Sequence, residues 1–219
     1  MEHHYVRRYL IFIVGLLLNS FGVAFVTKAA LGTSPIAAIP YSLSLIIPKL
    51  SLGNWTIIFS LFLIVIQIIL LRKKAKKIEL LLQVGISFVF GYFIDLSMLC
   101  LNAFSPQEYA VKLLSLFVGC VIIAFGAYLE VVADVAMLPG DAFVRAIAKV
   151  TRKVYGNIRV MSDVSMALIA GILCFICLHK LLGVREGTII AALITGNIIK
   201  IFVKILKSLS NFLVPNSAQ

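Results

Sequence analysis

Six long apolar segments constrain this chain more than any other feature of its sequence. They cover residues 9–27, 52–71, 80–101, 113–129, 158–178 and 187–203. Each is long enough, or nearly so, for a tilted α-helix to cross a hydrocarbon core roughly 30 Å thick. We therefore predict an all-α polytopic membrane protein with about six transmembrane helices, folded as a single membrane domain over residues 1–219.

Composition excludes an ordinary soluble domain. Hydrophobic residues make up 62% of the chain and charged residues 13%, whereas soluble domains contain roughly 25% charged residues. The net charge of +11 is also found in proteins that bind nucleic acid. Here the basic residues lie between the apolar segments, where the positive-inside rule accounts for them. The expected partner is the lipid bilayer, not a nucleic acid.

The basic residues also predict the orientation. If the N-terminus is cytoplasmic, 15 of the 20 Lys and Arg residues lie inside. The remaining five lie outside and are Lys28, Lys49, Lys112, Lys180 and Arg185. This bias favours six crossings with both termini in the cytoplasm.

The two halves of the chain repeat the same pattern of glycines and prolines. Matching pairs recur at offsets of 103 to 105 residues: Gly15 and Gly119, Gly22 and Gly126, Pro35 and Pro139, Gly53 and Gly156, Gly91 and Gly196. Such matches are more informative than leucines, which are common in every membrane helix. We predict one repeat over residues 9–104 and a second over 111–207. Because each holds three crossings, the second is inverted, a plan that recurs in secondary transporters.

Each predicted repeat also contains a proline-led segment that does not span. Residues 36–47 follow Pro35 and are too short to cross, so they are expected to be re-entrant or interfacial. Their counterpart, 142–155, follows Pro139. There Phe143, Ala146, Ile147, Val150 and Val154 share one helical face. The opposite face is basic and predicts a helix at the inner membrane surface, with Arg145, Lys149, Arg152 and Lys153.

Three motifs in the sequence resemble those of the YczE/YyaS/YitT family of bacterial membrane proteins. They are Leu31–Pro35, Leu138–Asp141 and Leu182–Thr188, and the resemblance extends over about residues 10–202. It implies a bacterial inner-membrane protein and names no substrate. Proteins of this family have a Gly-x-x-Pro-x-Asp-like motif in each half. Here the first copy has Ala37 in place of the acid, and the second has Ala136 in place of the glycine.

Four acidic residues are candidates for a solute or ion path. Asp141 either compensates the dipole of its helix or presents a polar group at a helix break. Glu130 and Asp134 are spaced i, i+4 and are expected to face the same way, where they either bind a cation or a proton or pair with Arg145 or Lys149. Asp95 lies inside the third apolar segment, and ionisable residues inside spans are functional candidates by default.

Lys200 is the counterpart of Asp95 at an offset of 105 residues. The two could form a pair or a gate, although Lys200 can also extend to the inner surface. Asp163 is interpreted as interfacial. The pathway candidates are Pro35, Asp95, Glu130, Asp134, Pro139, Asp141 and Lys200.

No catalytic motif is recognisable, so we expect neither an enzyme nor a cofactor. The cysteine and histidine spacings predict no metal site, and Cys100, Cys120, Cys174 and Cys177 are interpreted as small core hydrophobes. The leading hypothesis is a transporter or permease for an unknown small solute. The alternatives are a non-catalytic binding subunit and a regulatory or assembly partner of a larger membrane complex. A homo-oligomer or a membrane partner protein fits either class.

Overall fold

The structure is a computed structural model that describes residues 2–72, 76–180 and 183–206. Within these ranges the chain folds into helices and turns. The helices are α1 (Glu2–Lys28), α2 (Pro35–Ile46), α3 (Leu52–Leu71), α4 (Lys77–Cys100), α5 (Tyr109–Ala133), α6 (Pro139–Thr151), α7 (Tyr155–Leu178) and α8 (Glu186–Ile205). The prediction of an all-α protein is confirmed.

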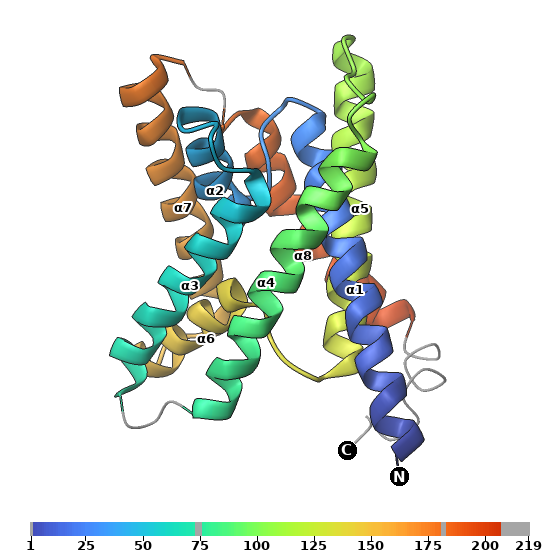
Figure 1. Ribbon diagram of the computed structural model, residues 1–219, viewed down its shortest axis with the longest axis vertical. Coiled ribbons are helices and arrows are strands. Elements are labelled where there is room, and N and C mark those ends of the chain that lie inside the picture. The colour runs from blue at the N-terminus through green and yellow to red at the C-terminus, as the bar shows by residue number, and fades with distance from the viewer. Residues whose placement is uncertain (1, 73–75, 181–182, 207–219) are drawn as a thin grey trace.

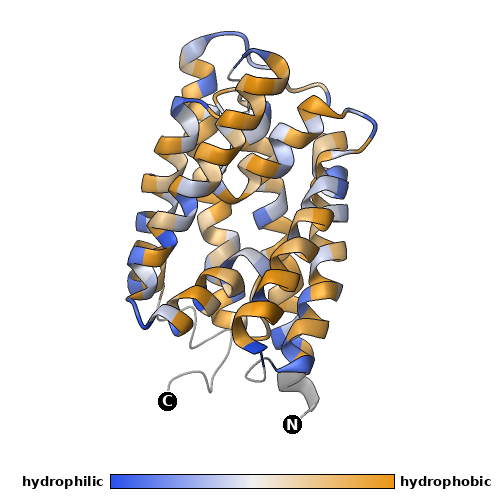
Figure 2. Ribbon diagram, turned by 90° about the vertical axis from the view of Figure 1, so that its left-hand side faces the viewer, coloured by the Kyte–Doolittle hydropathy of each residue, from blue (hydrophilic) through white to orange (hydrophobic). Residues whose placement is uncertain are grey.

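Six of these helices are long and apolar enough to cross a membrane, namely α1, α3, α4, α5, α7 and α8. They lie within a few residues of the six predicted segments, apart from longer ends on α1 and α5. Large apolar side chains such as Ile69 and Leu99 are exposed on the outside of the bundle, and Figure 2 shows that apolar residues predominate along the helices. The chain is therefore a multi-pass membrane protein whose outer surface contacts lipid.

Two ends of the bundle are distinguished below (Figure 1). The end at which α1 begins is called the proximal end, and the opposite end, where α1 turns into α2, is called the distal end. The short helix α2 follows α1 at the distal end, and the short helix α6 follows α5 at the proximal end. A proline opens each short helix at its first turn, where the missing N–H needs no partner.

Glycines allow α1 and α5 to cross at very short range. A Cβ built on Gly126 would lie 2.6 Å from the backbone nitrogen of Asn19, and one on Gly22 would lie 2.8 Å from that of Ile123. Gly15 and Gly119 complete the contact, each beside the backbone of the partner helix. Small residues at such a crossing let the backbones approach and gain van der Waals contact without lipid between them.

Two long helices flank this pair. α4 packs against α1, and α8 packs against α5. Each short helix packs against both α3 and α7, so α2 links these helices in the distal half and α6 links them in the proximal half. Figure 1 shows α3 and α4 close together distally and diverging toward the proximal end, where α6 lies.

The prediction for α6 is partly wrong. The helix ends at Thr151, four residues before the expected end, and Val150 and Val154 of the expected apolar face are exposed. Val144 and Ala148 are buried instead, because α6 contacts α3 on one side and α7 on the other. The four basic residues Arg145, Lys149, Arg152 and Lys153 are exposed, as the sequence predicts.

The prediction for the cysteines holds for two of the four. Cys120 and Cys174 are buried, whereas Cys100 and Cys177 are exposed. Cys100 and Cys177 lie on helix faces that the neighbouring helices leave uncovered. Their exposure depends on how the helices pack, which composition alone does not predict.

Candidate functional site

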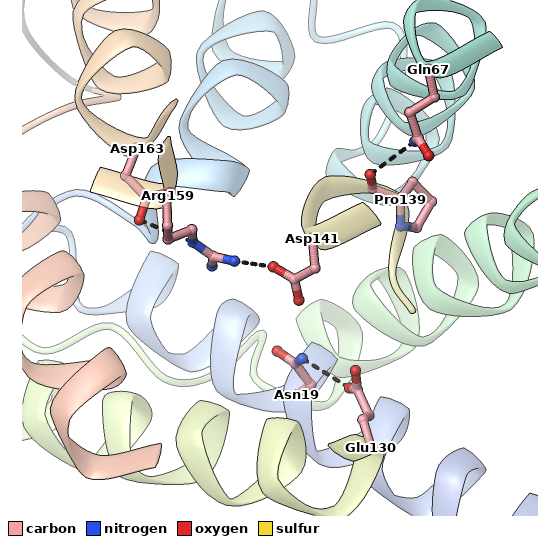
Figure 3. A network of polar contacts seen from close by, with 7 residues as sticks. All are labelled: Asn19, Gln67, Glu130, Pro139, Asp141, Arg159 and Asp163. Carbon is pink, nitrogen blue, oxygen red and sulfur yellow. Dashed lines mark hydrogen bonds and ion pairs between the residues drawn. The ribbon is translucent and has the colours of Figure 1, made fainter. Parts of the chain in front are cut away.

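Five polar side chains from α1, α5, α6 and α7 come together inside the bundle in its proximal half (Figure 3). We call this group the buried charge cluster; its members are Asn19, Glu130, Asp141, Arg159 and Asp163. Its innermost members are Asn19 and Glu130, which are 7% and 8% exposed. The Asn19 amide Nδ2 donates a hydrogen bond of 2.9 Å to Glu130 Oε1 and so links α1 to α5.

Arg159 joins the two remaining acids of the cluster. Its Nη1 donates to Asp141 Oδ1, and its Nε donates to Asp163 Oδ2 at 3.2 Å. The first contact links α7 to α6, and the second spans one turn of α7. The other carboxylate oxygen of Asp163, Oδ1, is buried and has no hydrogen-bond partner.

Asp141 lies between the Arg159 guanidinium and the Asn19–Glu130 pair, as Figure 3 shows. Pro139 fixes the start of α6, which places Asp141 in the first turn of that helix. There the positive end of the helix dipole favours a carboxylate. Gln67 of α3 donates from Nε2 to the Pro139 carbonyl at 3.2 Å and holds this turn in place.

The cluster contains three carboxyl groups and one guanidinium. Charges taken out of water are costly unless they are paired or neutralised. Arg159 pairs with Asp141 and Asp163, and within the described part of the chain the Glu130 carboxyl accepts a hydrogen bond only from the neutral amide of Asn19. The cluster therefore has an excess of acid over base. Among the described residues, no group of three His, Cys, Asp or Glu side chains is arranged to hold a metal ion.

Asp95 occupies a different place, at the distal end of α4. Its Oδ1 accepts a hydrogen bond of 2.8 Å from the Gly53 N–H, and its Oδ2 accepts one of 2.5 Å from the Ser51 hydroxyl. Asp95 therefore fixes the start of α3 to α4. Lys200 is exposed on α8, and the structure does not bring it to Asp95.

The prediction that Glu130 and Asp134 face the same way is wrong. The helix α5 ends at Ala133, and Asp134 has a left-handed backbone with φ of 45°. Asp134 is exposed and pairs with Arg8 at 3.3 Å. Arg8 also donates to the carbonyls of Ala133 and Asp134, both at 2.8 Å, and so caps the end of α5. A small cavity of about 180 Å³ adjoins this contact.

The residues that follow the two helix-opening prolines make an apolar contact with each other. A Cβ built on Gly140, next to Pro139, would lie 3.2 Å from the side chain of Ile36, next to Pro35. In the distal half, a hydroxyl contact links the loop after α1 to α8. The Thr188 hydroxyl accepts from the Thr33 N–H at 3.2 Å, and all of these groups are buried.

Comparison with known proteins places the chain in a family. Residues 6–204 match the model of a family of unknown function, DUF6198. The chain belongs to this family.

Two proteins of Bacillus subtilis (strain 168) are similar to this DUF6198 member. An uncharacterized protein, YyaS, is 30% identical over 135 residues, which are 61% of this chain and 65% of YyaS. An uncharacterized membrane protein, YczE, is 29% identical over 202 residues, which are 91% of this chain and 87% of YczE. These relatives confirm the resemblance inferred from the sequence motifs. No solved structure matches the chain significantly.

Four functional candidates in this DUF6198 protein are not among those that the sequence predicts. Asn19 is a lone amide in the middle of an apolar span. Polar residues inside a span often mark a functional position, and this was the available signal. The sequence counts Arg159 only among the 15 basic residues of the cytoplasmic side, and it predicts an interfacial position for Asp163. Their i, i+4 spacing was the available signal that they pair on one face of α7. Gln67, likewise, is a buried amide within an apolar segment.

Proposed function

We propose that this DUF6198 protein is a non-catalytic small-solute transporter of the bacterial inner membrane, with both termini in the cytoplasm. The observation that carries the proposal is the buried charge cluster. Ionisable side chains inside a membrane domain are costly and typically mark paths for solutes, ions or protons. In this proposal the proximal end of the bundle is cytoplasmic, in keeping with the excess of basic residues there.

Reciprocal helix contacts support an inverted repeat of α1–α4 and α5–α8. In the first proposed repeat α1 packs against α4, and in the second α5 packs against α8. Likewise, α2 packs against α7, and α6 packs against α3. The central crossing is reciprocal too, because Gly15 lies beside Gly126 while Gly22 lies beside Gly119. In transporters built this way, substrate and coupling ions bind where the repeats meet.

The buried charge cluster lies at such a meeting point. Asn19 belongs to the first proposed repeat, and Glu130, Asp141, Arg159 and Asp163 belong to the second. A solute or proton that entered the cluster would therefore contact both repeats. Relative movement of the repeats would then alter the site, as alternating access requires.

Reconstitution into liposomes tests the proposal. Purified protein is sealed into vesicles containing a pH-sensitive dye, and a panel of cationic, neutral and anionic small solutes is added with and without a pH gradient. We expect solute or proton flux above that of empty vesicles, reduced at least tenfold by Glu130→Gln. Asp134→Asn is the matched control, because it removes an exposed carboxyl near the same helix end. Flux equal to that of empty vesicles for the whole panel would refute transport.

The apolar contact between Ile36 and Gly140 favours a second candidate, a binding or regulatory subunit of a larger membrane complex. A closely packed region between the two prolines is what a non-transporting subunit would have. Affinity purification in mild detergent distinguishes the two functions. A stoichiometric ATPase pair, or another membrane protein that loses activity when this chain is deleted, would support the second.

A further inference from the structure

Two helix pairs that correspond under the proposed repeat differ in their contacts. The first pair, α3 and α4, is packed at the distal end. A Cβ built on Gly91 would lie 2.7 Å from the Gly53 carbonyl oxygen, so the two backbones touch. Asp95, one turn after Gly91, accepts hydrogen bonds from the Gly53 N–H and the Ser51 hydroxyl and stabilises this contact. We call this contact the distal gate.

The second pair, α7 and α8, does not form a packed contact over its described residues. Gly156 and Gly196 occupy the positions that correspond to Gly53 and Gly91, and a Cβ on either would meet nothing within 4 Å. Lys200, which corresponds to Asp95, is exposed and has no acceptor in α7. We call this separated pair the proximal gate.

The two gates lie toward opposite ends of the bundle. Gly53 is in the first turn of α3 at the distal end, and Gly156 is in the first turn of α7 at the proximal end. The buried charge cluster lies on the side of the separated pair. Although Arg159 and Asp141 lie inside the bundle, their side chains remain 34% and 31% exposed. The cluster thus lies near the separated pair, and two of its side chains are partly accessible.

We infer that the structure is an inward-open state of an alternating cycle in which the distal and proximal gates close in turn. This inference rests on the proposed transport function. In the opposite state, α7 closes on α8 through Gly156 and Gly196, and α3 separates from α4 as Asp95 leaves Ser51 and Gly53. The cluster then loses its proximal access and gains access from the distal side.

The exchange of Asp95 for Lys200 explains why this state is the resting one. A carboxylate stabilises the positively polarised start of a helix, and an ammonium group there is unfavourable. Closing the proximal gate would bring Lys200 toward the start of α7, whereas Asp95 already stabilises the start of α3. The charges at these two positions therefore bias the protein toward a closed distal gate and an open proximal gate.

Spin-label distances test this bias in the full chain reconstituted in liposomes. The four native cysteines are replaced by alanine, and cysteines for labelling are introduced in pairs at exposed positions. The pair Asn54→Cys with Tyr92→Cys reports the distal gate, and Asn157→Cys with Asn197→Cys reports the proximal gate. We expect one short distance for the distal pair and a predominantly longer distance for the proximal pair.

Reversing the charge at the proximal gate provides the decisive variant. Lys200→Asp should raise the ratio of the short to the long proximal distance at least tenfold and lengthen the distal distance in the same molecules. Lys204→Asp, with the same charge change one turn farther on, should leave both distributions as in the wild type. Lys200→Glu is a second variant with the same expected shift, and gel filtration verifies that each variant is folded.

The possible outcomes separate this inference from the proposed function. A proximal distance that stays long in both Lys200 variants, in vesicles that show flux, would overturn the alternating gates and leave transport standing. Distances that exchange in vesicles without any flux would overturn transport. Exchange together with flux supports both.

Discussion

The proximal and distal halves of the central α1–α5 crossing have the same geometry and different chemistry. In the proximal half, Asn19 of α1 contacts Glu130 of α5. At the repeat offset of 104 residues the corresponding positions are Ile123 of α5 and Val26 of α1. These two residues lie together in one apolar cluster of the distal half. An apolar pair is thus sufficient to pack this crossing, so the polar pair in the proximal half is not there for packing.

The short helices show the same difference. Asp141 in the first turn of α6 corresponds to Ala37 in the first turn of α2. Ala37 is buried among apolar residues, whereas Asp141 meets Arg159. Each half therefore has the same short helix opened by proline, and of the two short helices only α6 has an acidic residue in its first turn. This comparison indicates that the fold can form without the charges of the cluster.

Removing the one cation of the cluster should have the largest effect on stability. Arg159→Met leaves Asp141 and Asp163 without their partner inside the bundle, and we expect a loss of about 3 kcal/mol in the free energy of unfolding. Unfolding in mixed detergent micelles measures it. Arg152→Met, at an exposed position just after α6, is the control and should change stability by less than about 0.5 kcal/mol. Equal stability of the two variants would show that the ion pairs do not form.

Converting the proximal pair into the distal one should separate stability from function. Asn19→Ile alone leaves Glu130 buried without its hydrogen-bond donor, which should cost about 2 kcal/mol. Adding Glu130→Val recreates the apolar pair of the distal half and should restore most of that loss, while solute or proton flux stays absent. Urea or detergent unfolding and the liposome assay are run on the same preparations. A double variant that retains full flux would contradict a role of this pair in transport.

The sequence predicted the architecture better than the site. The six spans followed from apolar length, because lipid forces every backbone polar group in a span into a helix. Gly15, Gly22, Gly119 and Gly126 were recognisable as a repeat from their spacing, and the structure uses all four at one crossing. Such features depend on local composition and on periodicity, which a single sequence contains.

The cluster depended on which helices become neighbours, and the sequence did not contain that information. Asn19 and Glu130 are 111 residues apart and meet only because α1 and α5 cross. Asp134 was grouped with Glu130 by helical spacing, but α5 ends at Ala133 and turns Asp134 toward Arg8. Arg159 lies at the start of the predicted segment 158–178, and the sequence does not show that Asp141 of α6 is its neighbour.

Alanine substitutions of the corresponding glycines in α4 and α8 sharpen the comparison of the two gates. Gly91→Ala places a methyl group against the Gly53 carbonyl and the Ile57 side chain, and should destabilise the protein by about 1–2 kcal/mol. Gly196→Ala meets open space and should be neutral or stabilise α8 by up to about 1 kcal/mol. Thermal unfolding of both variants measures the difference. Equal destabilisation would mean that α7 and α8 are packed in solution.

Removing the carboxyl of Asp95 should have the smallest effect on stability and a clear effect on the gates. Asp95→Ala removes the acceptor of the Gly53 N–H and the Ser51 hydroxyl at the start of α3. The loss of such a cap costs about 1 kcal/mol, because water at the distal end takes over part of the hydrogen bonding. The same loss weakens the distal gate, so the spin-label pair at Asn54 and Tyr92 should show a second, longer distance. Glu79→Ala removes an exposed carboxyl from the opposite end of α4 and should leave that distance distribution unchanged. An Asp95→Ala protein with a single short distal distance would show that the Gly53–Gly91 contact alone holds α3 on α4, and that the charges at these positions do not set the resting state.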